Sequence, residues 1–151
     1  MSGIIVGVDG SANARYALQW AVMEAASKHE PLTVLTVNEV AASFWTHQPI
    51  TVPADHALLE KARQAAAELV DKAVSELDGP APASVTVRAI NGFASDELVR
   101  ASREADLVVV GARGGAQSGG LAHHTPVGSV SNKVLHHSQC PVVVVPAPHA
   151  G

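Results

Sequence analysis

Two kinds of hydrophobic pattern alternate along the chain. Short runs of apolar, largely β-branched residues are typical of strands that are buried on both faces of a sheet. Between them lie longer segments in which apolar residues recur every three or four positions, which indicates amphipathic helices. The predicted strands, in chain order, cover residues 4–8, 32–37, 84–90, 107–110 and 141–145. The predicted helices cover residues 14–28, about 54–77, a short stretch from Ser95, and 129–137.

The strict alternation of strand and helix predicts an α/β domain with a single doubly wound, five-stranded parallel sheet and helices on both faces. Residues 84–90 differ from the other strands because Val85, Val87 and Ala89 alternate with Thr86 and Arg88. This alternation predicts a half-exposed strand at an edge of the sheet. The helix at 54–77 is expected to bury one stripe of residues, which consists of Leu58, Ala62, Ala65, Leu69, Ala73 and Leu77.

The composition narrows the class of protein. The chain has 151 residues, of which 47% are hydrophobic, and this suits one packed domain. We expect that domain over residues 1–146 and a flexible tail over 147–151. The net charge of −4, without a basic run, argues against a nucleic-acid partner. A single cysteine, no secretion signal and no membrane-spanning apolar run predict a cytoplasmic protein without a membrane partner.

Candidate chemistry gathers at the carboxyl ends of the predicted strands, where parallel sheets bind ligands. These ends carry Asp9, Val37-Asn38, Asn91-Gly92 and Gly111. Gly111 opens the cluster Gly-Ala-Arg-Gly-Gly, and the last helix begins with Gly-Ser-Val-Ser at 128–131. Glycines let a ligand approach the backbone, and the first amides of a helix have no partner within the helix and attract anions. The pattern predicts a phosphate site to which the hydroxyls of Ser129 and Ser131 could also donate. The alternative is that the glycines make turns and Ser129 only caps a helix.

The familiar phosphate-binding motifs are absent. Gly115 and Gly120 have the glycine spacing of a P-loop, but Leu121 occupies the position that requires lysine. No Gly-x-Gly-x-x-Gly follows the first strand, so a dinucleotide site of that kind is not expected. His136 and His137 are adjacent near the end of the last predicted helix and do not share a helix face, and we assign no metal site to them or to the pair at 123–124.

Taken together, four segments of the sequence resemble the universal stress protein family over nearly the whole chain. They are Ile-Ile-Val-Gly-Val-Asp-Gly-Ser at 4–11, Ala-Asp-Leu-Val-Val-Val-Gly-Ala-Arg-Gly at 105–114, Gly-Ser-Val-Ser at 128–131 and Cys-Pro-Val-Val-Val-Val at 140–145. The ATP-binding branch of the family has the motif Gly-x2-Gly-x9-Gly-Ser/Thr. This chain has Gly111, Gly114 and Gly128-Ser129, but thirteen residues, 115–127, separate the second and third glycines.

The resemblance implies the adenine nucleotide alpha-hydrolase-like fold, which is Rossmann-like, with strand order 3-2-1-4-5. It also implies a stress-response module that binds ATP, or else ADP, AMP or cyclic AMP, with Mg²⁺ accompanying the nucleotide. The nucleotide-binding residues that it implies are Gly7, Val8, Asp9, Val37, Val110, Gly111, Gly114, Gly128, Ser129, Val130 and Ser131. A homodimer through the last strand, Val142–Val145, is implied as well, and pairing would cover an apolar edge strand.

Two other functions stay open at this stage. The lengthened segment 115–127 could fill the site, which would leave a nucleotide-free dimeric interaction protein. A slow ATPase is the second alternative, although phosphoryl transfer needs positioned cations and the chain has no P-loop lysine. We assign no catalytic residue and expect weak ATP hydrolysis at most.

Overall fold

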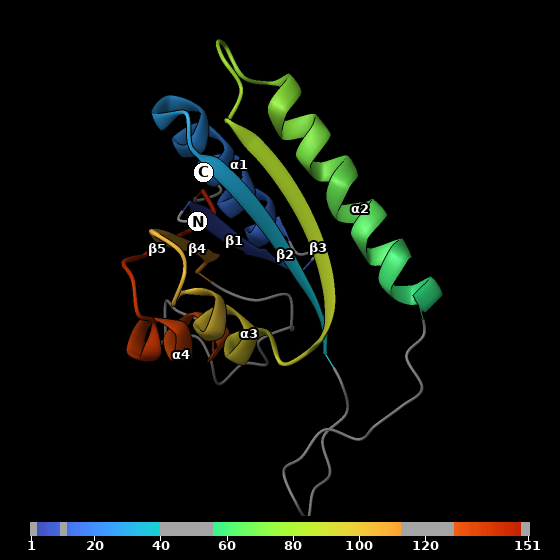
Figure 1. Cartoon of the computed structure of the whole chain (residues 1–151), viewed down its shortest axis with the longest axis vertical. Helices are drawn as coiled ribbons and strands as arrows, with labels where there is room; N and C mark the ends of the chain where they lie inside the picture. The colour runs from blue at the N-terminus through green and yellow to red at the C-terminus, as the bar shows by residue number, and fades with distance from the viewer. Residues whose placement is uncertain (1–2, 10–11, 40–55, 113–128, 149–151) are drawn as a thin grey trace, which may run out of the picture.

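A computed structural model describes residues 3–9, 12–39, 56–112 and 129–148. Within them the chain forms one parallel five-stranded sheet in the order β3-β2-β1-β4-β5, with helices on both faces (Figure 1). This is the predicted architecture. In chain order the elements are β1 (Ile4–Val8), α1 (Ala12–Lys28), β2 (Pro31–Glu39), α2 (His56–Ser75), β3 (Ser84–Gly92), α3 (Ala94–Ala101), β4 (Leu107–Gly111), α4 (Ser129–His137) and β5 (Val142–Val145).

The sheet separates two hydrophobic clusters, one on each face. Helices α1 and α2 pack on the first face, where small residues of α1 such as Ala17 and Ala21 are fully buried against the strands. Helices α3 and α4 lie side by side on the second face (Figure 1), where Leu98 and Val134 belong to one cluster with Val108 and Val110 of β4. Alternate residues of a strand therefore enter different clusters, and this explains the unbroken apolar runs of β1 and β4.

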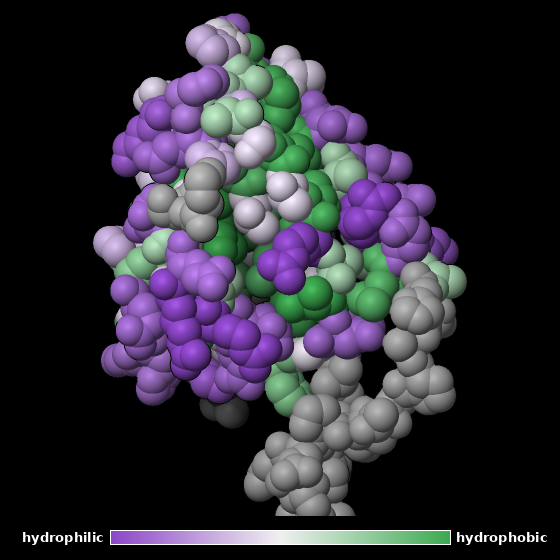
Figure 2. Space-filling view, in the orientation of Figure 1, coloured by the Kyte–Doolittle hydropathy of each residue, from purple (hydrophilic) through white to green (hydrophobic). Residues whose placement is uncertain are grey.

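Strand β3 lies at the sheet edge, as its alternating pattern predicted, and its residues alternate between exposed and half-buried along most of its length. Figure 2 shows the face that carries α3 and α4. Hydrophilic side chains cover α2 and the outer sides of α3 and α4, and apolar residues remain visible between them, over β2 and β3. None of the helices in the described ranges is long and apolar enough to cross a membrane.

The predicted buried stripe of α2 is only partly right. Ala66, Val70 and Ala73 are buried, whereas Leu58 is 55% exposed and Ala65 is also exposed. The consecutive alanines at 65–67 explain the error, because the apolar pattern there does not fix which side of the helix faces the sheet. The first turn of α2 does not bury Leu58, so the contact with the sheet is made further along the helix.

Candidate functional site

The backbone pairing of β1 with β4 ends earlier along the strand than its pairing with β2. Beside β4 it runs from Ile4↔Leu107 to Val6↔Val109, although β4 continues beside β5 to Gly111. Beside β2 it ends at Val8↔Thr36, although β2 continues beside β3 to Glu39. The order of strands along the chain reverses at β1, and the crevice outside such a switch point is where open parallel sheets bind ligands.

The structure brings most of the predicted site residues to this switch point. Asp9 follows β1 and is exposed, Val37 lies near the end of β2, and Gly111 ends β4. Val130 and Ser131 belong to the first turn of α4. Ser129 is the first residue of that helix, and its side chain is outside the described part of the chain. The remaining members, Gly114 and Gly128, are also outside the described residues.

Several of these side chains are packed in the protein interior, so any contact with a ligand would come from their backbone. Val8 is 6% exposed in the cluster beneath α1, and Val110 is 3% exposed in the cluster beneath α3 and α4. A Cβ added to Gly7 would lie 2.9 Å from Cδ1 of Leu98. A small residue is therefore required at position 7, because α3 packs closely over β1. This requirement holds whether or not a ligand is present.

Gly111 allows a second close approach, here between β4 and the first turn of α1. A Cβ at this position would lie 3.1 Å from the backbone oxygen of Asn13 and 3.2 Å from its carbonyl carbon. The end of β4 thus lies directly against the start of α1 on one face of the sheet. The first turn of α4 reaches the same point from the other side through Ser131.

Ser131 is buried, with 3% of its surface exposed, and its hydroxyl donates a hydrogen bond of 2.5 Å to the carbonyl oxygen of Gly111. A serine hydroxyl has one proton. In the structure that proton is directed at the protein backbone, whereas we expected it to be available to a phosphate. Val130, its neighbour in the first turn, packs against the cluster on the α3 and α4 face.

An asparagine pair lies near the carboxyl ends of β2 and β3, at the same end of the sheet as the residues described above. Asn38 and Asn91 occupy matching register positions, and Nδ2 of Asn38 donates to Oδ1 of Asn91 over 2.9 Å. We did not assign these residues to the site from the sequence, although both are polar residues near the ends of apolar strands. Each exposed amide has further hydrogen-bonding capacity, so the pair adds polar groups beside Val37.

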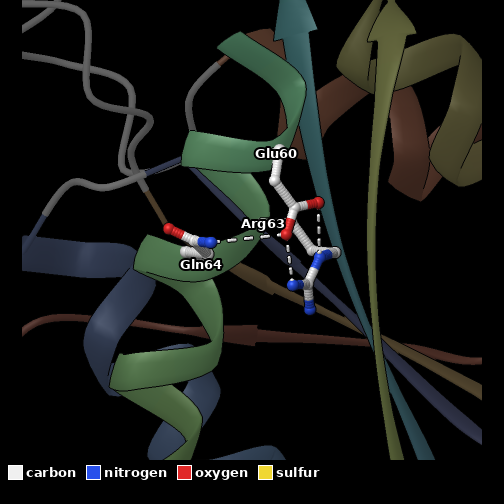
Figure 3. A network of polar contacts seen from close by, with 3 residues as sticks. All are labelled: Glu60, Arg63 and Gln64. Carbon is white, nitrogen blue, oxygen red and sulfur yellow. Dashed lines mark hydrogen bonds and ion pairs between the residues drawn. The ribbon is translucent and has the colours of Figure 1, made fainter. Parts of the chain in front are cut away.

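The electrostatic contacts of the described residues lie mainly on helix surfaces. Lys133 of α4 pairs with Asp96 of α3 at 2.5 Å and joins these two helices. On α2, Arg63 donates two hydrogen bonds to Glu60, and Gln64 donates another (Figure 3). The bond from Arg63 lowers the pKa of Glu60 below its ordinary value of 4.5. These pairs are exposed, so they contribute little stability and identify no site.

No group of three or more potential metal-binding side chains forms among the residues the structure describes. A separate, open groove of about 420 Å³ lies between α1 and the segment that follows β5. Its lining carries no charged side chain and consists of Tyr16, Gln19, Trp20, Met23, Val145, Pro146, Ala147 and Pro148. This apolar groove lacks the anion-binding groups that a nucleotide requires.

Comparison with known proteins agrees with this geometry. The model of the universal stress protein family matches residues 1–146. A universal stress protein of Mycobacterium tuberculosis is 31% identical over 144 residues, which is 95% of this chain and 47% of that protein. The chain thus spans about half the length of the curated relatives it matches.

Two solved structures share the fold. A universal stress protein in complex with cAMP is 24% identical, with 95% of each chain covered and a TM-score of 0.66. The universal stress protein of Archaeoglobus fulgidus in complex with dAMP is 19% identical, with 96% of this chain and 98% of the other covered and a TM-score of 0.61. The sheet order and the neighbours identify the adenine nucleotide alpha-hydrolase-like fold. By the family match and this shared fold, the chain belongs to the universal stress protein family.

Proposed function

We propose that this chain binds an adenine nucleotide, with ATP as the principal ligand, at the carboxyl ends of β1, β2 and β4. The observation that carries the proposal is the convergence of two helix starts on Gly111, at the place where β1 and β4 cease to pair. Helix starts offer backbone amides and a positive dipole end, and both favour a phosphate chain. Two related structures hold cAMP and dAMP, which supports an adenine nucleotide as the ligand class.

In this proposal the backbone does most of the binding. The amides of Ser129, Val130 and Ser131 in the first turn of α4 bind the phosphates, since the first amides of a helix lack partners within it. Gly111 lets the ribose and phosphates approach, with Gly114 and Gly128 assisting as the family motif implies. Mg²⁺ would accompany the nucleotide and neutralise part of its charge.

The adenosine end lies towards β1 and β2. The carboxylate of Asp9 is exposed and can accept hydrogen bonds from ribose hydroxyls or the adenine amine. Val37 lies one residue beyond the last pair between β2 and β1, so adenine can pair with the backbone of β2 there without displacing a strand. The protein would act as a stress-response binding module in the cytoplasm, with hydrolysis slow or absent.

Calorimetric titration tests the proposal. ATP should release measurable heat, and GTP at the same concentration should bind at least tenfold more weakly, because a site built around adenine leaves polar groups unpaired against guanine. Mass spectrometry of the denatured protein should find any nucleotide that co-purifies with it. Absence of heat with ATP, ADP and cyclic AMP at millimolar concentration would refute the proposal and favour a nucleotide-free interaction protein.

The same proposal includes a homodimer through β5. This strand is at the edge of the sheet and is wholly apolar. Val108 of β4 and Ala112, which follows β4, donate backbone hydrogen bonds to Pro141 and Val145. Since successive residues of a strand point their backbone groups to opposite sides, those of Val142 and Val144 face away from β4. A second copy could pair with them, and such pairing protects an edge strand from indiscriminate association.

A further inference from the structure

The peptide unit between Gly111 and Ala112 lies where β4 loses one of its two neighbours. The N–H of Ala112 donates to the carbonyl of Val145 in β5 over 2.9 Å. In a planar trans peptide the N–H and C=O groups point in opposite directions. The carbonyl of Gly111 therefore points towards the β1 side of the strand. The last pair between β1 and β4 is Val6↔Val109, so the pairing of these two strands ends before Gly111.

A backbone carbonyl at the end of a buried strand needs a donor, because leaving it unpaired away from water is costly. If the ladder continued, a backbone N–H of β1 would supply that donor. The hydroxyl of Ser131 supplies it, at 2.5 Å and from a side chain that is 3% exposed. A side chain of α4 thus takes the place of a strand in completing the hydrogen bonds of β4.

We infer that the hydroxyl of Ser131 positions the nucleotide site and does not itself bind the phosphates. Its hydroxyl satisfies the Gly111 carbonyl, so β1 and β4 can separate at the ligand edge without leaving that group unpaired. The same bond fixes the first turn of α4, whose amides face the phosphates. This inference rests on the proposed function for its ligand, but the bond itself is a property of the free protein.

The bond also connects the two helix starts. Gly111 lies against the backbone of Asn13 in the first turn of α1, at distances that a methyl group would fit only if the neighbouring backbone shifted. A shift of Ser131 would therefore move α4 relative to both β4 and α1. The hydroxyl of Ser131 and the contact between Gly111 and Asn13 together set the separation of the two helix starts, and a phosphate chain that contacts α4 depends on that separation.

Threonine and valine make a matched pair of substitutions, since they have nearly the same shape and differ by the hydroxyl. Ser131→Thr should keep ATP affinity within about threefold of the unmodified protein, and Ser131→Val should lower it about tenfold or more, from the loss of one buried hydrogen bond. Ser131→Ala should resemble Ser131→Val and serves if the larger side chains prevent folding. Equal ATP affinity of the threonine and valine variants, or of Ser131→Ala and the unmodified protein, would overturn the inference.

Nuclear magnetic resonance of the full chain separates positioning from direct binding. In the free protein the hydroxyl proton of Ser131 should exchange slowly with water, and Ser131→Val should shift the carbonyl carbon of Gly111. Both signatures should persist after ATP is added. Their loss on adding ATP would make the hydroxyl of Ser131 a phosphate ligand, and their absence from the free protein would show that the bond does not form. If they are present but ATP does not bind, the proposed function fails while the structural role of Ser131 stands.

Discussion

The contact between Gly111 and α1 allows a prediction of magnitude for Gly111→Ala. The new methyl group would lie 3.1 Å from the oxygen and 3.2 Å from the carbonyl carbon of Asn13. Both atoms belong to the backbone, so neither can rotate away as the end of a side chain could. Relief therefore requires the first turn of α1 or the end of β4 to move by a few tenths of an ångström.

Two opposing effects set the expected stability of this variant. Overpacking of a well-packed region costs about 1–3 kcal/mol. Replacing glycine recovers about 0.4–1 kcal/mol, because alanine restricts the unfolded chain. We therefore expect Gly111→Ala to lower the free energy of unfolding by about 1–2 kcal/mol, measured by urea denaturation. We also expect ATP affinity to fall about tenfold, since the displacement occurs between the two helix starts of the proposed site.

Val70→Ala provides the matched control. Val70 lies in α2, is 5% exposed and packs in the cluster beneath α1 and α2, away from the strand ends at the site. Removing its methyl groups should cost about 2 kcal/mol through lost burial and the cavity left behind. ATP affinity should not change. If Val70→Ala weakens ATP binding as much as Gly111→Ala does, the loss reflects general stability, and the argument from the site's geometry is wrong.

Three further predictions concern other parts of the chain. Val144→Pro removes an outward N–H from β5 while the bonds to β4 remain, so light scattering at micromolar concentration should report a monomer. The control variant Val144→Thr should stay dimeric, and a dimer for both variants would exclude β5 pairing. Arg63→Gln should raise the pKa of Glu60 towards 4.5, measured from its carboxyl carbon resonance. Because that pKa is lowered in the folded protein, its small stabilisation exists above the unfolded-state pKa and is lost as acid protonates Glu60; an unchanged pKa in the variant would disprove the Arg63 contribution. Ser102→Ala should cost about 1–2 kcal/mol on thermal unfolding, because the buried hydroxyl accepts the N–H of Gln139 at 2.9 Å, and an unchanged melting temperature would contradict this.

The fold could be predicted from the sequence because its strands and helices have different hydrophobic periods. β-Branched runs such as those of β1 and β4 enter two clusters at once, so they contain no polar residue that would break the pattern. Along β3, apolar residues such as Val85 alternate with polar residues such as Arg88, and this alternation predicted a strand with one exposed face at the edge of the sheet. The burial of α2 could not be resolved in this way, since three consecutive alanines fit more than one rotation of the helix.

The candidate site was predicted less completely, because its key features depend on where strand pairing ends. Composition and spacing drew attention to Gly111 and Ser131, and the family resemblance placed both near the phosphates. Neither source indicates the direction of the carbonyl of Gly111, which follows from the bond between Ala112 and Val145. The pairing of Asn38 with Asn91 is likewise invisible in the sequence, as it requires the register between β2 and β3.

A parallel sheet that opens at its switch point must satisfy the backbone groups that the departing strand leaves behind. Water can do this at an exposed edge, but the end of β4 lies beneath α4, where Ser131 is almost fully buried. A short hydroxyl side chain in the first turn of the following helix is well placed for the task, since that turn must approach the strand end to present its amides to an anion. The same hydrogen bond therefore satisfies the strand end where the sheet opens and positions the first turn of α4. Serine at 131 therefore serves two requirements, whereas the side chain of its neighbour Val130 packs in the cluster on the α3 and α4 face.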